Sequence, residues 1–206
     1  SVRTSENATG SHTVNNKDME GIYPVTSAQK RMLIQSTIAQ DSVAYNLYEA
    51  VHIKGNLDVY RFINAIRTTI LMNEVFYTKL LLYEDGIFQV VGKCNIDIPL
   101  VPFEKGSLDE YISRFVTPFQ LGEAPLIRCV ILQRALDEYI FVYDVHHIAF
   151  DGVSRRLFID SIVSLYQGET VNFGKPYKDY AIWQEKFHTS KEYALQRNYW
   201  IHKVRP

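Results

Sequence analysis

The feature that most constrains the fold is an apolar segment that ends in two histidines and leads into an amphipathic helix. Residues 140–145 are mostly apolar or β-branched, which predicts a largely buried strand. His146 and His147 end this strand, and a short turn carries Asp151 and Gly152. The following helix ends at Gly168 and has one apolar face, made of Val153, Leu157, Phe158, Ile162, Leu165 and Tyr166. A buried strand that brings two histidines to a helix N-terminus is a suitable place for chemistry.

The paired histidines allow three interpretations. A histidine at a strand end is more often a hydrogen-bonded structural residue than a catalyst, since histidine is intermediate in burial. A shared metal ion is not predicted, because adjacent strand residues point to opposite faces and no Cys or Glu lies nearby in sequence to complete a ligand set. The alternation indicates instead that one histidine supports the site and the other acts in it.

Composition limits the class of protein. The 206 residues are 47% hydrophobic with a formal net charge of -1, which is enough for a sizeable core in one or two domains and gives no sign of nucleic-acid binding. No apolar run is long enough to cross a membrane. Residues 1–20 lack the apolar stretch of a signal peptide and are predicted to be a flexible linker. We therefore expect a cytoplasmic protein with Cys94 and Cys129 as reduced core thiols.

The remaining elements follow from periodicity and capping signals. Thr26 and Gln29 form a capping box for a helix that we expect to run to about Gln40. Residues 45–54 alternate as a strand in which Glu49 is out of pattern. We also expect a helix capped by Asp58, a hairpin with strands at 80–83 and 88–91, a short strand at 96–101, a helix with a Ser107–Glu110 capping box, a strand at 127–132, and a helix whose aromatic stripe of Tyr180, Trp183 and Phe187 forms core.

Five segments together resemble one family, the condensation domains of nonribosomal peptide synthetases, within the chloramphenicol acetyltransferase-like superfamily. Residues 146–152 match its HHxxxDG motif, and residues 27–32 resemble SxAQxR(L/M). Residues 118–128 resemble PFDLxxxPLxR with Gln120 in place of Asp. Residues 177–184 match YxDYAxWQ at every specified position, and residues 196–200 resemble the segment that closes the first half of the domain. The resemblance covers about residues 22–204.

One segment departs from the family pattern. Where the family usually has RHExLRTxF, this chain has Met72, Asn73 and Tyr77 in place of the first Arg, the His and the second Arg, while Glu74 and Thr78 are kept. Those basic residues usually help to hold the region beneath the active site. Because of this departure, the resemblance implies full activity less strongly for this chain than for a chain that keeps the basic residues.

The resemblance implies an α/β fold (an α+β two-layer sandwich), namely a chloramphenicol acetyltransferase-like lobe with a mixed sheet packed by helices. Residues 21–206 would form the N-terminal lobe of a two-lobed domain. His147 would contact the acceptor amine as general base or hydrogen-bond acceptor, and Gly152 would offer its N–H at a helix N-terminus. His146 would be structural, and Asp151 would hold the turn by pairing with Arg31.

The implied reaction joins a donor acyl or peptidyl thioester to the amine of an acceptor aminoacyl group. Both substrates would be tethered by 4'-phosphopantetheine to partner carrier domains, one upstream and one downstream. The C-terminal lobe of the same domain would be a further partner, and without it we expect the single lobe to be inactive. The resemblance implies no directly bound cofactor, no metal, no nucleic acid and no membrane.

Two other functions are compatible with the sequence. One is a stand-alone acyltransferase that uses acyl-CoA and completes its site as a homotrimer, with His147 as base. The YxDYAxWQ match argues against that alternative. The other is a degenerate, non-catalytic lobe that docks carriers, which the altered segment 72–77 favours and the intact HHxxxDG motif opposes.

Overall fold

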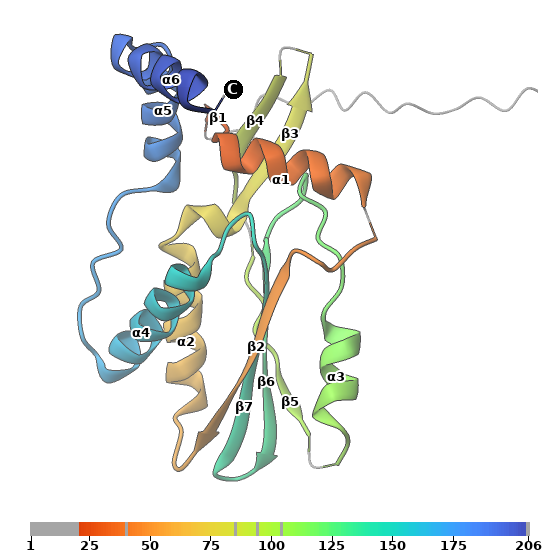
Figure 1. Ribbon diagram of the computed structural model, residues 1–206. Coiled ribbons are helices and arrows are strands. Elements are labelled where there is room, and N and C mark those ends of the chain that lie inside the picture. The colour runs from red at the N-terminus through yellow and green to blue at the C-terminus, as the bar shows by residue number, and fades with distance from the viewer. Residues whose placement is uncertain (1–20, 40, 85, 94, 104, 205–206) are drawn as a thin grey trace, which may run out of the picture.

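The structure is a computed structural model that describes residues 21–39, 41–84, 86–93, 95–103 and 105–204. Three sequence-based expectations lie outside the described residues: the linker at 1–20, the thiol of Cys94 and the helix end at Gln40. In chain order the elements are β1 (Ile22–Pro24), α1 (Ser27–Ile38), β2 (Asn46–Lys54), α2 (Val59–Leu71), the 3-10 helix η1 (Glu74–Tyr77), β3 (Thr78–Tyr83), β4 (Gly86–Val91), β5 (Leu100–Pro102), α3 (Leu108–Phe115), β6 (Ile127–Ala135), β7 (Glu138–His146), α4 (Gly152–Gln167), α5 (Tyr177–His188) and α6 (Lys191–Val204) (Figure 1).

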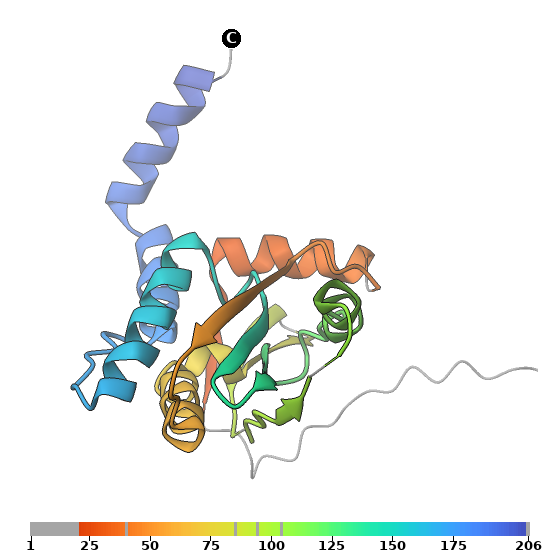
Figure 2. The same cartoon turned by 90° about the horizontal axis from the view of Figure 1, so that it is seen from below.

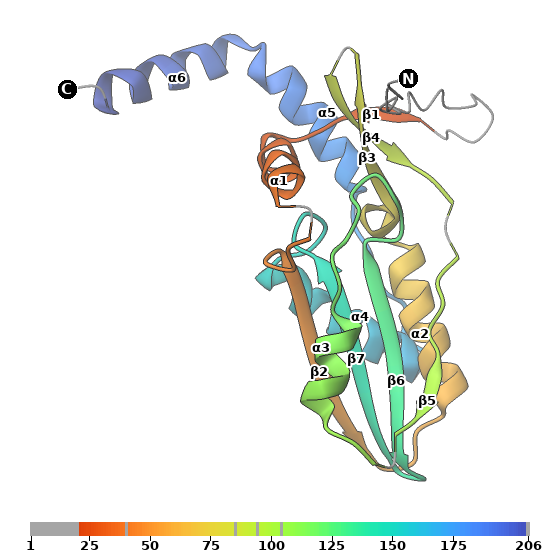
Figure 3. The same cartoon turned by 90° about the vertical axis from the view of Figure 1, so that its right-hand side faces the viewer.

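A four-stranded sheet in the order β2-β7-β6-β5 forms the centre of the molecule. β7 is antiparallel to both neighbours, whereas β5 is parallel to β6, so the sheet is mixed as predicted. Alternate residues of β6 and β7 face opposite layers. Those such as Ile131 and Phe141 pack with α2 and α4, and those such as Val130 and Val142 pack with α3 (Figures 1 and 3).

A second, antiparallel sheet in the order β1-β4-β3 lies above one end of the first (Figure 1). It contains the predicted hairpin. Buried Gln89 of β4 joins this sheet to α1, because Gln29 of α1 donates to its side-chain oxygen at 3.4 Å. The Gln89 amide also donates to Pro24 O of β1, within the sheet, at 2.7 Å. The predicted capping box of Thr26 and Gln29 is present at the start of α1.

α5 packs beside β1, and α6 extends away from the rest of the chain (Figures 2 and 3). The prediction that the aromatic stripe of α5 forms core is wrong. Tyr180 and Trp183 are about half exposed, and the rings of Tyr180, Trp183 and Phe187 stack on one another instead. None of the helices in the described ranges is long and apolar enough to span a membrane.

Two further expectations need correction. The strand expected at 96–101 is paired only at Leu100–Pro102, although Ile96 and Ile98 are buried; Pro99, which has no N–H to donate, precedes the paired part. On α4, Phe158 and Ile162 are buried as predicted, but Val153 and Leu157 are 71% and 61% exposed. The first two turns of α4 border open space rather than the sheet.

A buried charge lies within the central sheet. Asp144 of β7 is fully buried, and its carboxylate accepts hydrogen bonds from Asn46 Nδ2 at 2.9 Å and Arg128 Nη1 at 3.0 Å. Arg128 also donates to the carbonyls of Thr117 and Pro118, and its guanidinium lies over the Phe119 ring. Burial raises the pKa of Asp144 to about 6, against the opposing effect of Asn46 and Arg128. These partners are therefore needed to keep the carboxylate charged.

We predict that Arg128→Ala lowers the free energy of unfolding by about 3 kcal/mol, because it leaves a buried carboxylate without its cation. The matched control is Arg156→Ala on α4. Arg156 pairs with Asp160, but both side chains are exposed, so its loss should cost less than about 1 kcal/mol. Urea denaturation followed by far-UV circular dichroism measures both. Equal small losses in the two variants would contradict the role of Arg128 as the cation that stabilises buried Asp144.

Candidate active site

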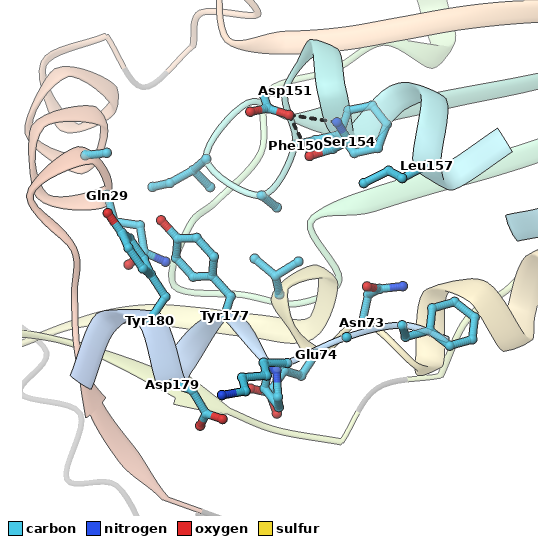
Figure 4. Close-up of a pocket in the computed structure, with 18 of the residues that line it drawn as sticks. Gln29, Asn73, Glu74, Phe150, Asp151, Ser154, Leu157, Tyr177, Asp179 and Tyr180 are labelled. Carbon is cyan, nitrogen blue, oxygen red and sulfur yellow. Dashed lines mark hydrogen bonds between the residues drawn. The ribbon is translucent and has the colours of Figure 1, made fainter. Parts of the chain in front are cut away.

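The end of β7 opens onto a cavity of about 920 Å³ that is lined from four directions. Its walls come from α1, from the segment 72–77, from the turn and first helical residues at 147–157, and from the segment 173–183 that leads into α5. Figure 4 shows Gln29, Tyr177 and Tyr180 on one side, with Asp151 and Ser154 across from them. The altered segment therefore contributes directly to this wall.

A second cavity of about 460 Å³ lies on the other side of the same turn, between β2 and α4. His147, Phe150 and Asp151 line both cavities. The turn after β7 thus borders both spaces, and His147 is the one basic side chain in the described lining of both.

The backbone N–H groups of His146, the last residue of β7, and of His147, the first residue of the turn, are bonded to different segments. The His146 N–H donates to Leu126 O at 3.1 Å, and the His147 N–H donates to Tyr45 O at 2.7 Å on the opposite side of the strand. Each histidine backbone is thereby held by a different neighbouring segment. The separate tasks of the two side chains stay a prediction.

His146 is buried, and its Nδ1 accepts a hydrogen bond from the Ile148 N–H at 3.1 Å. Burial lowers the pKa of His146 to about 4, with a smaller contribution from His147, so the ring is neutral near pH 7. A neutral ring that holds the turn has the properties of a supporting residue. The His147 ring, in contrast, has a buried Nδ1 that makes no hydrogen bond within the described residues.

The predicted pair of Asp151 and Arg31 is wrong. Asp151 is exposed, and its Oδ1 accepts hydrogen bonds from the Ser154 N–H at 2.8 Å and the Ser154 hydroxyl at 2.7 Å. It is the N-cap of α4, and the bonds from Ser154 lower its pKa. Arg31 is exposed on α1, and no ion pair joins it to Asp151 in the described chain. The helix N-terminus satisfies the carboxylate without a distant cation.

Gly152 begins α4, is exposed and lines the 460 Å³ cavity. A Cβ added there would meet nothing within 4 Å among the described residues. Close packing within the chain therefore does not require glycine at this position. Its role as an N–H donor to substrate stays a prediction.

Two ion pairs beside the cavities were not predicted from the sequence. Lys178 of α5 pairs with Glu74 of η1, which ties α5 to the altered segment. Arg155 of α4 pairs with Glu49 of β2, the residue that breaks the alternation of its strand. An acidic residue on the inward side of a strand was the one sequence signal for the second pair.

The altered segment is well connected despite its missing basic residues. Asn73 Nδ2 donates to Thr69 O at 2.7 Å, Tyr77 donates to Leu71 O at 2.9 Å, and Thr78 donates to Glu74 O at 2.7 Å. Local hydrogen bonds thus hold the segment in place. Among the described residues no group of three or more His, Cys, Asp or Glu side chains is placed to hold a metal ion. Cys129 is a buried free thiol whose pKa is raised by burial.

Comparison with known proteins identifies the class. The family model of the condensation domain matches residues 19–205, so the chain belongs to the condensation-domain family. It is 34% identical over 181 residues to bacitracin synthase 1 of Bacillus licheniformis, covering 87% of this chain and 3% of that protein. It is 29% identical over 202 residues to tyrocidine synthase 2 of Brevibacillus parabrevis, covering 97% of this chain and 6% of that protein.

Solved structures agree on the fold. The starter condensation domain of a rhizomide synthetase superposes with a TM-score of 0.80 at 19% identity, covering 91% of this chain and 49% of that one. The condensation domain of the monacolin K polyketide synthase gives a TM-score of 0.79 at 20% identity, covering 92% of this chain and 44% of that one. The chain thus spans about half of a condensation domain and corresponds to its N-terminal half, with the fold of the chloramphenicol acetyltransferase-like superfamily. Membership of this family implies a transferase role.

We predict that Asp151→Ala lowers the free energy of unfolding by about 1 kcal/mol, the usual cost of losing an N-cap side chain. Asp151→Asn should retain most of that stability, because its amide oxygen accepts the same bonds. Arg31→Ala, the matched surface control, should change stability by less than about 0.5 kcal/mol. Thermal or urea unfolding measures all three variants. A loss of stability in Arg31→Ala as large as that in Asp151→Ala would support an ion pair between Arg31 and Asp151 after all.

Proposed function

We propose that this chain is the histidine-bearing half of a condensation domain that joins two carrier-tethered substrates through an amide bond. The observation that supports this most strongly is the position of His147 between two cavities. A reaction between two separately delivered substrates needs a reactive centre that both can reach. The turn at 147–151 provides such a centre, since its residues His147, Phe150 and Asp151 line both spaces.

In this reaction the acceptor amine attacks the donor thioester carbonyl, the C–S bond breaks, and the amine proton must leave as the C–N bond forms. We assign to His147 the positioning of the amine and acceptance of its proton. No carboxylate of the described residues accepts a hydrogen bond from the buried Nδ1 of His147, so no acid fixes the ring as in a catalytic triad. Positioning therefore carries more of the catalysis than strong basicity does.

The 4'-phosphopantetheine arm would bring each thioester to this centre. The larger cavity, at about 920 Å³, is of the size that small-molecule sites have, and it mixes apolar residues such as Met32 and Trp183 with polar ones such as Asn73. These walls fit an arm that is uncharged near its thiol. The carriers upstream and downstream, and the C-terminal lobe, are the partners in this proposal.

We predict that the 206-residue chain alone forms no dipeptide from loaded donor and acceptor carriers, because one lobe provides only part of the walls. The same assay on a complete condensation domain containing this chain should give product. An arm with acyl-CoA as donor tests the alternative of a stand-alone acyltransferase. Turnover by a verified monomer in either arm would overturn the requirement for the second lobe.

We predict that His147→Ala in the complete domain loses activity at pH 7 and stays defective at pH 9. General acid–base catalysis typically contributes about 10²–10⁴-fold. An α-amine with a pKa of about 7.7–8.0 is already roughly one-tenth neutral at pH 7, so simple deprotonation is worth about tenfold at most. The measurement is the rate of single-turnover amide formation from pre-loaded carriers, for the parent and the variant at each pH.

The matched control is His52→Ala on β2, an exposed histidine far along the strand from the cavities, which should retain parent activity. Near-complete recovery of His147→Ala at pH 9 would show that solvent replaces the histidine and that positioning is not its task. A docking lobe without catalysis would show no dependence on His147 at either pH.

A further inference from the structure

The 460 Å³ cavity beside His147 contains a polar cluster that the proposed chemistry does not use. Glu49, Tyr143 and Arg155 all line it, together with Asp151 and Gly152 from the turn. The Tyr143 hydroxyl donates to Glu49 Oε2, and Arg155 donates to both carboxylate oxygens, with its Nε 2.7 Å from Oε2. A charged cluster on the wall of a substrate-sized space has the chemistry to select among substrates.

Glu49 is the fixed member of this cluster. It lies on β2 opposite Tyr143 in the sheet register, and its side chain is only 24% exposed. The Tyr143 ring is buried among Phe141, Phe150 and Phe158, so the hydroxyl that holds Glu49 cannot move far. Arg155 lowers the pKa of Glu49, which keeps it ionised.

Arg155 is the movable member. Its side chain is 60% exposed on the second turn of α4, whereas the Glu49 side chain is 24% exposed. Turning the guanidinium into solvent breaks its two hydrogen bonds to Glu49, and a substrate cation that makes the same bonds would replace them. This movement would leave two carboxylates, Glu49 and Asp151, on a cavity that His147 also borders.

We propose that Glu49 selects an amino-acid substrate with a basic side chain, and that Arg155 occupies the place of that side-chain cation until the substrate arrives. This inference rests on the proposed function for the identity of the substrate as an amino acid. The geometry alone supports the cation preference, because a substrate ammonium or guanidinium would meet a carboxylate that the Tyr143 hydroxyl holds in place, and it would take over the ionic contact that Arg155 makes. Exchange of one cation for another at Glu49 needs no rearrangement of the sheet.

The test measures the binding of three amides to the 206-residue chain by NMR chemical-shift titration. L-ornithinamide carries a side-chain ammonium, L-norvalinamide has the same carbon chain without it, and L-glutamic acid α-amide carries a side-chain carboxylate. We expect L-ornithinamide to bind about fivefold more tightly than L-norvalinamide. Because free amides need neither carriers nor the second lobe, this result is independent of whether amide formation succeeds.

Variants separate the roles within the cluster. Arg155→Gln should strengthen L-ornithinamide binding about threefold by removing the internal competitor, and Glu49→Gln should abolish the preference over L-norvalinamide. Arg156→Gln is the matched control, since Arg156 pairs with Asp160 and does not line the cavity; it should leave binding unchanged.

Three outcomes would overturn the proposal. Tightest binding of L-glutamic acid α-amide, lost in Arg155→Gln, would make Arg155 the selector of an anion. Weaker L-ornithinamide binding in Arg155→Gln would show that Arg155 is not a competitor. A preference that survives Glu49→Gln but is lost in Asp151→Asn would move the selection to Asp151.

Discussion

The backbone hydrogen bonds of β7 determine where the chemistry of this molecule can occur. β7 lies between β2 and β6, and its residues from Tyr139 to His146 are buried, so its backbone groups must be paired within the sheet. The ladder continues one residue further on each side, to Leu126 for His146 and to Tyr45 for His147. The backbone of both histidines is therefore positioned by the sheet and the two segments beside it, before the turn continues.

Local patterns predicted most elements because each is encoded over a few neighbouring residues. The buried strand before the histidines, the helix ending at Gly168 and the Thr26–Gln29 capping box all depend on such short-range signals. The partners of charged residues depend on strand register and helix placement, which no local pattern contains. Asp144 pairs with Arg128 through adjacent strands. Asp151, which we expected to pair with Arg31, instead accepts a hydrogen bond from Ser154, three residues away.

Apolar periodicity indicates which side of a helix is apolar, but not whether the same chain covers it. Phe158 of α4 is buried, while Leu157 borders the larger cavity and is mostly exposed. The aromatic stripe of α5 likewise predicted core and was found stacked on itself with Trp183 about half exposed. Both departures lie around the cavities. An apolar side chain left in the open is the physical requirement for lining a substrate space.

The positions of the two tryptophans have a spectroscopic consequence. Trp183 lies on α5 and Trp200 on α6, and they are 54% and 62% exposed. The aromatic partners of Trp183 are Tyr180 and Phe187 of α5, and that of Trp200 is Tyr199 of α6, so indole emission reports chiefly on the last two helices. Loss of that signal on heating would mark the release of α5 and α6, and melting of the sheet that carries the histidines would have to be followed through its backbone or its buried tyrosines.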